Sequence, residues 1–491
     1  MTQVRTWSWA ALAGLAVPLA LAATPASAAT AAKAYDFDGN GKPELATGAP
    51  LLNRGSTWQA GGVVVAGKII TQSTSKVAGS SEEGDHFGSA LASADFDRDG
   101  YADPAVGLPG EDFSGKADAG AVTILYGTSK GLTGTRSKQI SEPGGKYRYA
   151  GFGGAVAAGD LNGDGYADLA VGAVDDLVDR LTEDDNPSSG TVTVLYGGAS
   201  GIQTSGSKRL RGDRGEDWDH HFGSALAIAD VDADSRLDLV VVSEGSNAEA
   251  AAHPGSLSYC AGTSSGPTTC RRLLHNRALQ AAGAVVVGNV QGDARAEIVI
   301  GVPTTDADTD PGSLHVVRLA GTGAATTGAG SRFDQDDAGL PGTGDVPDYF
   351  GAALAIGPVD GDGYADLVVG APAEAVGDED AGRVFLVRGG STGLATSGNT
   401  AYDQDTAGVP GGSEDGDGFG AAVTLLDSSG DGTVDLTVGA PGEDDGQGRV
   451  TTLPGTGSGF TTTGARAYGL ASVDVNYDNR YEGSFGEVLG Q

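Results

Sequence analysis

The 491-residue chain is poor in basic, sulfur-containing and aromatic residues. It holds 30 lysines and arginines against 65 aspartates and glutamates, one methionine, two cysteines, and aromatic side chains at 6% of its positions. The net charge of −35 excludes nucleic-acid binding, which needs clustered basic side chains at the phosphates, and argues against docking on anionic lipid. The 83 glycines favour many short strands and tight turns over long helices.

Long apolar runs are absent apart from one near the N-terminus. Arg5 precedes the apolar stretch 9–23, and Ala26-Ser27-Ala28 has the small residues of a cleavage site. Residues 1–28 are therefore predicted to be a signal peptide, and 29–491 a single secreted, extracellular domain. Because no second run of membrane length follows, we expect no membrane insertion.

The only two cysteines, Cys260 and Cys270, stand close together in the chain. In an exported protein one close pair favours a disulfide, here between the two arms of a hairpin. Two free thiols are the alternative.

One phrase recurs along the whole chain. "GDLNGDGYADLAVGA" at 159–173 has relatives that begin at residues 35, 94, 229, 288, 357 and 425. Most copies follow a Phe-Gly pair with small apolar residues, end in Gly-Ala-Pro or a variant of it, and lead to a further strand that opens with glycine. Four short strands per unit, repeated seven times, predict an all-β fold, a seven-bladed β-propeller with four antiparallel strands per blade.

These units resemble the FG-GAP repeats of the integrin α-subunit head and of exported bacterial proteins, over roughly residues 33–491. The resemblance implies a seven-bladed propeller with calcium held in hairpin loops, and it says less about the ligand. The first copy lacks a Phe-Gly strand, whereas Phe485-Gly486 lies near the C-terminus. We therefore expect segment 484–490 to complete the first blade and close the ring.

The acidic loops offer oxygen ligands at alternate positions, as calcium requires. A D-x-[DN]-x-D-G-x-x-D loop supplies side chains at positions 1, 3, 5 and 9 and a carbonyl at position 7. The two complete copies and the similar first loop give the following candidate ligands: Asp95, Asp97, Asp99 and Asp103; Asp160, Asn162, Asp164 and Asp168; and Asp36, Asp38, Asn40 and Glu44.

The other loops depart from this pattern by degrees. The fourth has Ser235 at the turn glycine, the sixth has Pro358 at position 1, and the seventh has a serine as a weaker ligand. Their candidate ligands are Asp230, Asp232, Asp234 and Asp238; Asp360, Asp362 and Asp366; and Asp427, Ser429, Asp431 and Asp435. The fifth loop, with Asn289, Gln291, Asp293 and Glu297, is expected to hold no metal, and Arg295 is expected to supply its positive charge.

Together the loops predict about three to six structural calcium ions. The alternative is that aspartate, asparagine and glycine only form hairpin turns. Against it, several carboxylates within nine residues repel one another unless a cation neutralises them.

Two motifs that suggest chemistry have a simpler interpretation. G-x-S-x-G occurs at 127–131, 262–266 and 389–393, always after the third strand of a unit, where a hairpin turn is expected instead of a hydrolase elbow. The Arg-Gly-Asp tripeptide at 211–213 is a weak adhesion hypothesis in a chain this rich in glycine and aspartate.

The face opposite the acidic loops carries the variable connections, where binding usually occurs on a rigid frame. The candidate ligand-binding side chains there are Trp58, Tyr149, Trp218, His221 and Tyr349. Aromatic rings beside carboxylates suit sugars, cations or basic proteins; the alternative is that the rings fill gaps between blades.

Two classes of function remain open. The favoured one is a monomeric binding or adhesion module for an extracellular protein or glycan. The other is a propeller-based enzyme, a polysaccharide lyase or glycoside hydrolase, which would need a cluster of histidine, tyrosine, arginine or carboxylate side chains at the axis.

Overall fold

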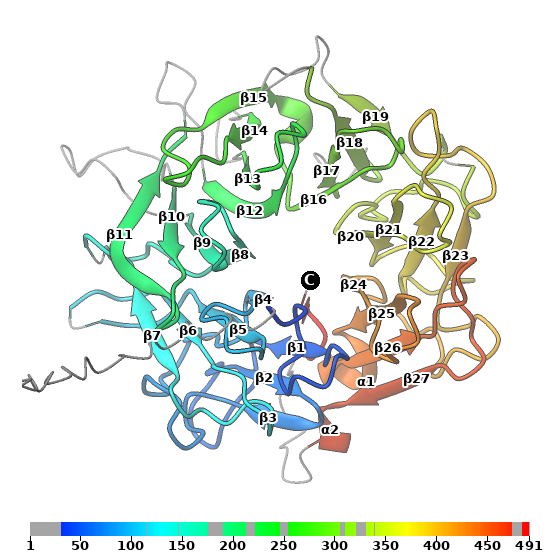
Figure 1. The fold of residues 1–491 in the computed structure, drawn as a ribbon. Coiled ribbons are helices and arrows are strands. Elements are labelled where there is room, and N and C mark those ends of the chain that lie inside the picture. The colour runs from blue at the N-terminus through cyan, green and yellow to red at the C-terminus, as the bar shows by residue number, and fades with distance from the viewer. Residues whose placement is uncertain are drawn as a thin grey trace, which may run out of the picture.

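The chain forms a ring of seven four-stranded antiparallel sheets around a central axis (Figure 1). The computed structural model describes residues 31–113, 115–145, 147–174, 190–212, 221–245, 254–304, 310–320, 330–337, 339–473 and 484–490. The predicted seven-bladed β-propeller is confirmed.

Each blade runs from an innermost strand at the axis to an outermost strand at the rim. The strands of blades 1 to 4, in this order, are β28 (Val488–Leu489), β1 (Ala46–Ala49), β2 (Gly62–Val65) and β3 (Lys68–Ile70); β4 (Leu91–Ala94), β5 (Asp103–Leu108), β6 (Ala121–Ile124) and β7 (Lys138–Ser141); β8 (Ala155–Gly159), β9 (Asp168–Ala173), β10 (Thr191–Tyr196) and β11 (Gln203–Leu210); and β12 (Phe222–Ala229), β13 (Asp238–Ser243), β14 (Gly255–Cys260) and β15 (Arg271–Asn276). Those of blades 5 to 7 are β16 (Ala284–Gly288), β17 (Glu297–Val302), β18 (Ser313–Val317) and β19 (Ser331–Phe333); β20 (Ala353–Gly357), β21 (Asp366–Ala371), β22 (Arg383–Val387) and β23 (Thr400–Tyr402); and β24 (Ala422–Leu426), β25 (Asp435–Ala440), β26 (Arg449–Leu453) and β27 (Arg466–Gly469).

Helical structure is limited to short turns: α1 (Glu443–Gly446), α2 (Leu470–Val473) and one 3₁₀ turn at Arg277–Leu279. None of the described helices is long and apolar enough to cross a membrane. Cys260, at the end of β14, is joined to Cys270 by a disulfide with the two Cα atoms 4.1 Å apart.

The first blade combines the two ends of the described chain. Its innermost strand β28 pairs with β1, with Leu489 opposite Thr47. The Gly490 N–H donates to the Ala46 carbonyl at 3.0 Å, and the Thr424 hydroxyl of blade 7 donates to the Gly490 carbonyl at 2.7 Å. These bonds join blade 7 to blade 1.

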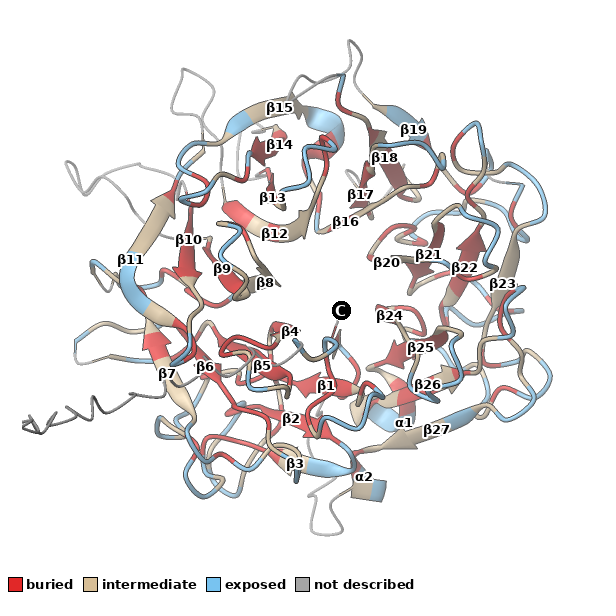
Figure 2. Ribbon diagram, viewed as in Figure 1, coloured by how far each residue is buried: buried red, intermediate tan, exposed pale blue. Residues whose placement is uncertain are grey.

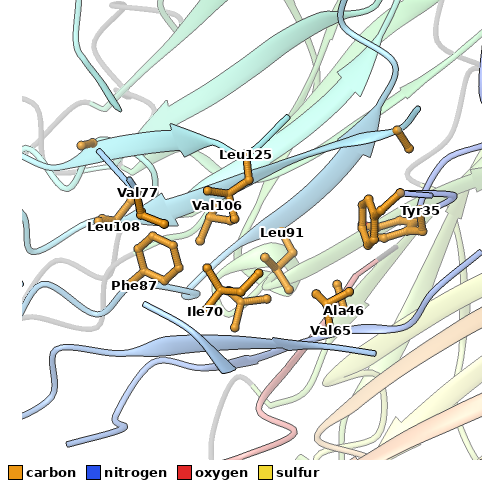
Figure 3. Packing of buried hydrophobic residues seen from close by; sticks show 14 residues of the cluster. Tyr35, Ala46, Val65, Ile70, Val77, Phe87, Leu91, Val106, Leu108 and Leu125 are labelled. Carbon is orange, nitrogen blue, oxygen red and sulfur yellow. The ribbon is translucent and has the colours of Figure 1, made fainter. Parts of the chain in front are cut away.

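Burial is most complete in the second strands, lower in several innermost strands at the axis and lowest at the rim. Every residue of β5, β9, β13, β17, β21 and β25 is buried, whereas the outermost strands β11 and β19 consist mostly of exposed and intermediate residues (Figure 2). The core lies between neighbouring blades: Phe87 of blade 2 packs with Ile70, Val77 and Leu108 (Figure 3).

The glycines of Phe-Gly and Gly-Ala-Pro allow neighbouring blades to approach closely. The Gly153 carbonyl oxygen of blade 3 lies 2.0 Å from the position that a Cβ on Gly107 in β5 would occupy. The pairs Gly48–Gly88, Gly172–Gly223, Gly301–Gly351, Gly370–Gly420 and Gly439–Gly486 repeat this contact with separations of 1.9 to 2.3 Å. A side chain at either glycine would force the blades apart.

Antiparallel strands place the connections on two faces. The acidic loops and the turns after the third strands share one, the acidic-loop face. The connections from second to third strands and those leading into each Phe-Gly share the other, the Phe-Gly face. The three G-x-S-x-G segments form turns on the acidic-loop face, closed by N–H···O bonds from Gly131 to Thr128, Gly266 to Thr263 and Gly393 to Gly390.

Candidate metal sites and binding face

In the five loops that begin with an aspartate, the carboxylate of that residue accepts backbone N–H groups from the rest of the loop. Asp95 accepts bonds from the N–H groups of Asp99 at 3.1 Å and Gly100 at 3.0 Å. Asp160, Asp230 and Asp427 accept the equivalent pairs, and Asp36 accepts from Gly41. In the fourth loop Ser235 takes the glycine position with φ 69°, so the departure seen in the sequence leaves the loop conformation unchanged.

The acid at position 9 links the loop to the third strand. Asp103 is fully buried and accepts from the Phe96 N–H at 3.1 Å and the Gly127 N–H at 2.9 Å. Asp168, Asp238 and Asp366 repeat both bonds at their own loops. Burial, the largest cause, raises the pKa of Asp103 to about 8 and that of Asp168 to about 7. A nearby cation would favour their ionised form.

Three loops bring carboxylates close enough together to share an ion. One oxygen from each acid lies within 4.8 Å of the others in the sets Asp36, Asp38 and Glu44; Asp95, Asp97 and Asp99; and Asp230, Asp232 and Asp234. In the third loop the Asn162 amide donates to Asp164 at 3.1 Å. Oxygen-only donor sets of this kind fit calcium, which takes six to eight such ligands.

In the fifth and sixth loops an arginine of the same blade pairs with the acidic side chains and balances part of their negative charge. Arg388 follows β22 and donates to Asp360 at 2.9 Å, with Asp366 at 3.8 Å. Arg318, at the same place after β18, pairs with Asp293 and, at 3.4 Å, with Glu297.

The predicted Arg295 acts on Asp293 through its charge, whereas the direct contacts in the fifth loop come from Arg318, which the sequence did not indicate. Arg295 donates to the Leu319 carbonyl, because its backbone position directs it to the end of the third strand instead of into the acids. In the second loop Arg136 also contacts Asp97 and Asp99, so a metal there would have to displace it.

The expected ligand-binding side chains on the Phe-Gly face lie at separate places around the ring. Trp58 is in the β1–β2 connection, Tyr149 leads into blade 3, His221 into blade 4 and Tyr349 into blade 6. Trp58 and Tyr149 are 48% and 55% exposed. Trp218 and the aspartate of the Arg-Gly-Asp tripeptide lie outside the described residues.

His221 and Tyr349 occupy a position with unusual backbone geometry. The residue before each described Phe-Gly has a positive φ, where glycine is least strained; the six are His86, Gly151, His221, Tyr349, Gly418 and Ser484. Large side chains at such positions carry a backbone cost of about 1–3 kcal/mol.

The axis of the ring holds a cavity of about 350 Å³ to which every blade contributes its innermost strand. The described lining residues carry alkyl side chains, except for the hydroxyls of Ser93 and Thr424. Among them there is no titratable cluster of the type that the enzyme hypothesis requires.

Sequence reasoning missed three sets of buried acids at blade interfaces. In each set the glutamate belongs to a Pro-x-Glu motif after the second strand, and the aspartate lies two residues before the Phe of Phe-Gly. The pairs are Glu111 with Asp85, Glu374 with Asp348 and Glu443 with Asp417. The recurrence of both motifs in the same three blades was the available signal.

Comparison with known proteins finds four segments of the chain that match one repeat family. The FG-GAP repeat model matches residues 87–125, 152–195, 350–387 and 419–453. Phosphatidylinositol-glycan-specific phospholipase D of Bos taurus is 37% identical over 159 residues, which are 32% of this chain and 18% of that protein. Integrin alpha-5 of Xenopus laevis is 35% identical over 149 residues, 28% of this chain and 14% of the integrin.

The matched segments thus span less than a fifth of either relative. Among solved structures, the Dos1 propeller aligns over 71% of this chain and 65% of its own with 14% identity and a TM-score of 0.37. An exotype rhamnogalacturonan lyase, YesX, aligns over 75% and 73% with 14% identity and a TM-score of 0.31.

Proposed function

The chain carries FG-GAP repeats, and on that premise we propose that it is a secreted, calcium-stabilised propeller that binds an extracellular protein or glycan on its Phe-Gly face. In this proposal residues 1–28 are the export signal and the domain acts as a monomer. N-terminal sequencing of the secreted protein and light scattering test these two points.

The distribution of exposed apolar side chains carries the proposal. Three large hydrophobic side chains of the described residues are exposed: Trp58, Tyr149 and Val346, the last at 40%. All three lie in connections on the Phe-Gly face, at blades 1, 3 and 6. Two of the three are aromatic, and their restriction to one face of an otherwise acidic, polar surface favours that face as the recognition surface.

Arginine adds a second type of contact at blade 3. The Arg148 guanidinium lies 5.0 Å from the centre of the Tyr149 ring and donates to its hydroxyl at 2.9 Å, and Arg209 lies over Tyr147 at 5.3 Å. Paired rings and guanidinium groups stack on sugars and on protein side chains alike.

Calcium acts in this proposal as a structural brace on the acidic-loop face. We assign it to the first, second, third, fourth and seventh loops, which have an aspartate at position 1; in the second loop the ion would displace Arg136 from Asp97 and Asp99. The fifth and sixth loops lack that aspartate and contain an arginine. The melting temperature of residues 29–491 is expected to rise in calcium relative to a chelator, because an ion at 100 times its Kd adds about 2.7 kcal/mol per site. Equal melting temperatures would remove calcium from the proposal.

Binding is tested by screening the domain against extracellular proteins and glycan arrays in calcium. Trp58→Ala combined with Tyr149→Ala should abolish the interactions found, whereas Tyr166→Ala on the acidic-loop face should preserve them. Ligands that bind the double variant as tightly as the native protein would exclude this face as the binding surface.

A further inference from the structure

Three blade interfaces share one buried set of side chains. In each, a glutamine lies two residues after the end of the outermost strand of one blade. Its side chain contacts the glutamate of the Pro-x-Glu motif in the next blade. Gln72 Nε2 lies 2.7 Å from Glu111 Oε2, Gln335 Nε2 lies 3.1 Å from Glu374 Oε1, and Gln404 donates to Glu443. With Asp85, Asp348 and Asp417, all nine side chains are at most 5% exposed.

Two of these interfaces contain an arginine that neutralises the acids. Arg383 begins β22 and lies 3.0 Å from Glu374, and Arg449 begins β26 and lies 2.5 Å from Glu443. In register these arginines face Ala371 and Ala440, the last residues of the second strands. Each guanidinium thus balances part of the buried negative charge of its interface.

In the part of the chain that the structure describes, the interface of blades 1 and 2 contains no such arginine. The residue in register with Leu108, the last of β5, is Ala121. Among the described residues no arginine or lysine forms an ion pair with Asp85 or Glu111, and the Glu82 and Asp112 charges add to the negative potential at Asp85. Burial above all raises the pKa of Asp85 to about 6 and that of Glu111 to about 7.

Several buried polar atoms at this interface have no hydrogen-bond partner, among them the donor Gln139 Nε2 and three oxygens. Gln72 Oε1, Asp85 Oδ1 and Ser81 Oγ are buried and have no hydrogen-bond partner. Gln72 is 4% exposed and Asp85 is fully buried. Gln335 Oε1 and Gln404 Oε1 also lack a partner in the interfaces that contain arginine, so the free oxygen that distinguishes this interface is Asp85 Oδ1, on a fully buried carboxylate with no ion pair to a basic side chain among the described residues. Buried oxygens are normally bonded, and such an oxygen favours a bound cation.

We propose that the interface of blades 1 and 2 binds a calcium ion through Glu111, Asp85 and Gln72, at the place that arginine takes in the interfaces of blades 5/6 and 6/7. Two carboxylates match a divalent charge, and hard oxygen donors in an irregular arrangement suit calcium better than magnesium. Rotating the Gln72 amide by half a turn exchanges Oε1 and Nε2 and brings its oxygen beside Glu111.

The ion would brace the Phe-Gly face independently of the acidic loops. The Gly84 N–H, next to Asp85, donates to the Trp58 carbonyl at 3.0 Å, and Gly110, next to Glu111, packs against the Gly84 carbonyl. The connection that carries the exposed Trp58 therefore rests on both ligand segments. Calcium bound here would order that connection.

Calcium stoichiometry, measured by equilibrium dialysis on the folded domain, tests the site. Glu111→Gln is expected to bind one ion fewer than the native protein, whereas the matched variants Glu374→Gln and Glu443→Gln lose none. An unchanged count for Glu111→Gln, or an equal loss in Glu374→Gln, would overturn the site and leave the acidic loops untouched. If the native domain binds no calcium at all, both this site and the calcium part of the proposed function fail.

A second pair of variants keeps the test decisive if Glu111→Gln folds poorly. Ala121→Arg recreates the internal arginine and should remove one ion while raising the melting temperature in chelator. Gln72→Leu with Glu111→Leu copies the interface of blades 7 and 1, where the fully buried Leu470 and Leu52 take these two positions. This apolar variant should fold with one ion fewer; a full complement of ions in either variant would refute the site.

Discussion

The guanidinium of Arg388 lies against the carboxylate of Asp360, with 2.9 Å between Nη1 and Oδ2. The loop that contains Asp360 is also the one whose first position is proline. Arg318 makes the corresponding contact with Asp293 in the fifth loop. Two loops that lack an aspartate at position 1 thus contain a positive charge provided by the third strand.

Arg388→Gln is expected to make the sixth loop dependent on a cation. The half-buried Asp360 and the fully buried Asp366 would lose their charged partner, which costs about 1.5–3 kcal/mol in chelator, and calcium should restore part of the loss. Urea unfolding with and without calcium measures this, with the exposed Arg466→Gln as the control. A loss that is the same in calcium and in chelator would show that the loop cannot accept an ion.

Asp232→Asn is expected to remove one calcium ion from the fourth loop. Asp232 is 7% exposed and accepts a 3.0 Å bond from the Tyr259 hydroxyl, so it holds its position while the charge is removed. The control is Asp293→Asn in the arginine-bearing fifth loop, which should bind as many ions as the native protein. Equilibrium dialysis counts the ions, and an undiminished count for Asp232→Asn would exclude calcium from that loop.

The pair Asp348 and Glu374 should make stability fall as pH rises. Burial first, and next the charge of Asp348, raise the pKa of Glu374 to about 8, and burial raises that of Asp348 to about 6. The folded chain therefore holds protons that the unfolded chain releases near pH 4.5. Because the folded state binds more protons, the pair stabilises the folded state fully below pH 4.5. This stabilisation is lost as the pH rises towards about 8.

Glu374→Gln, which copies the protonated form, should flatten this part of the profile. Urea midpoints at several pH values in chelator measure it, and the exposed Glu379→Gln is the matched control. A Glu374→Gln profile parallel to the native one would contradict the assignment of the slope to this pair.

Gly107→Ala is expected to destabilise the ring. Its Cβ would lie 2.0 Å from the Gly153 carbonyl oxygen of the next blade, and overpacking of this kind costs about 1–3 kcal/mol. Gly198→Ala is the control, because no atom lies within 4 Å of the new Cβ and its φ is not positive. Equal melting temperatures for the two variants would mean that the blades can separate at little cost.

The fold could be predicted from the sequence because each blade repeats the same local pattern. Within about forty residues, the succession of Phe-Gly, acidic loop and Gly-Ala-Pro indicates the order of the strands in a blade. The continuous apolar composition of the second strands predicts that they are fully buried. The acidic loops could be found for the same reason, since all their ligands lie within nine residues of one another.

Contacts between blades could not be found in this way. Gln72 and Glu111 are 39 residues apart and meet only when blade 1 packs on blade 2. The choice of Arg318 over Arg295 depends on which residue of the third strand faces Glu297, and strand register decides that. Both arrangements depend on how the strands and blades pair, which composition and local spacing do not encode.

The pairing of Leu489 with Thr47 also determines the order in which the ring can form. Nearly the whole described chain lies between these two residues, so forming their contact closes a very long loop and carries a high entropic cost. We therefore expect this contact to form late in folding. During synthesis blades 2 to 7 can assemble one after another, whereas β1 cannot pair with β28 until the end of the chain has been made. The junction of blades 7 and 1 is therefore where folding finishes and where mechanical or thermal opening of the ring would begin.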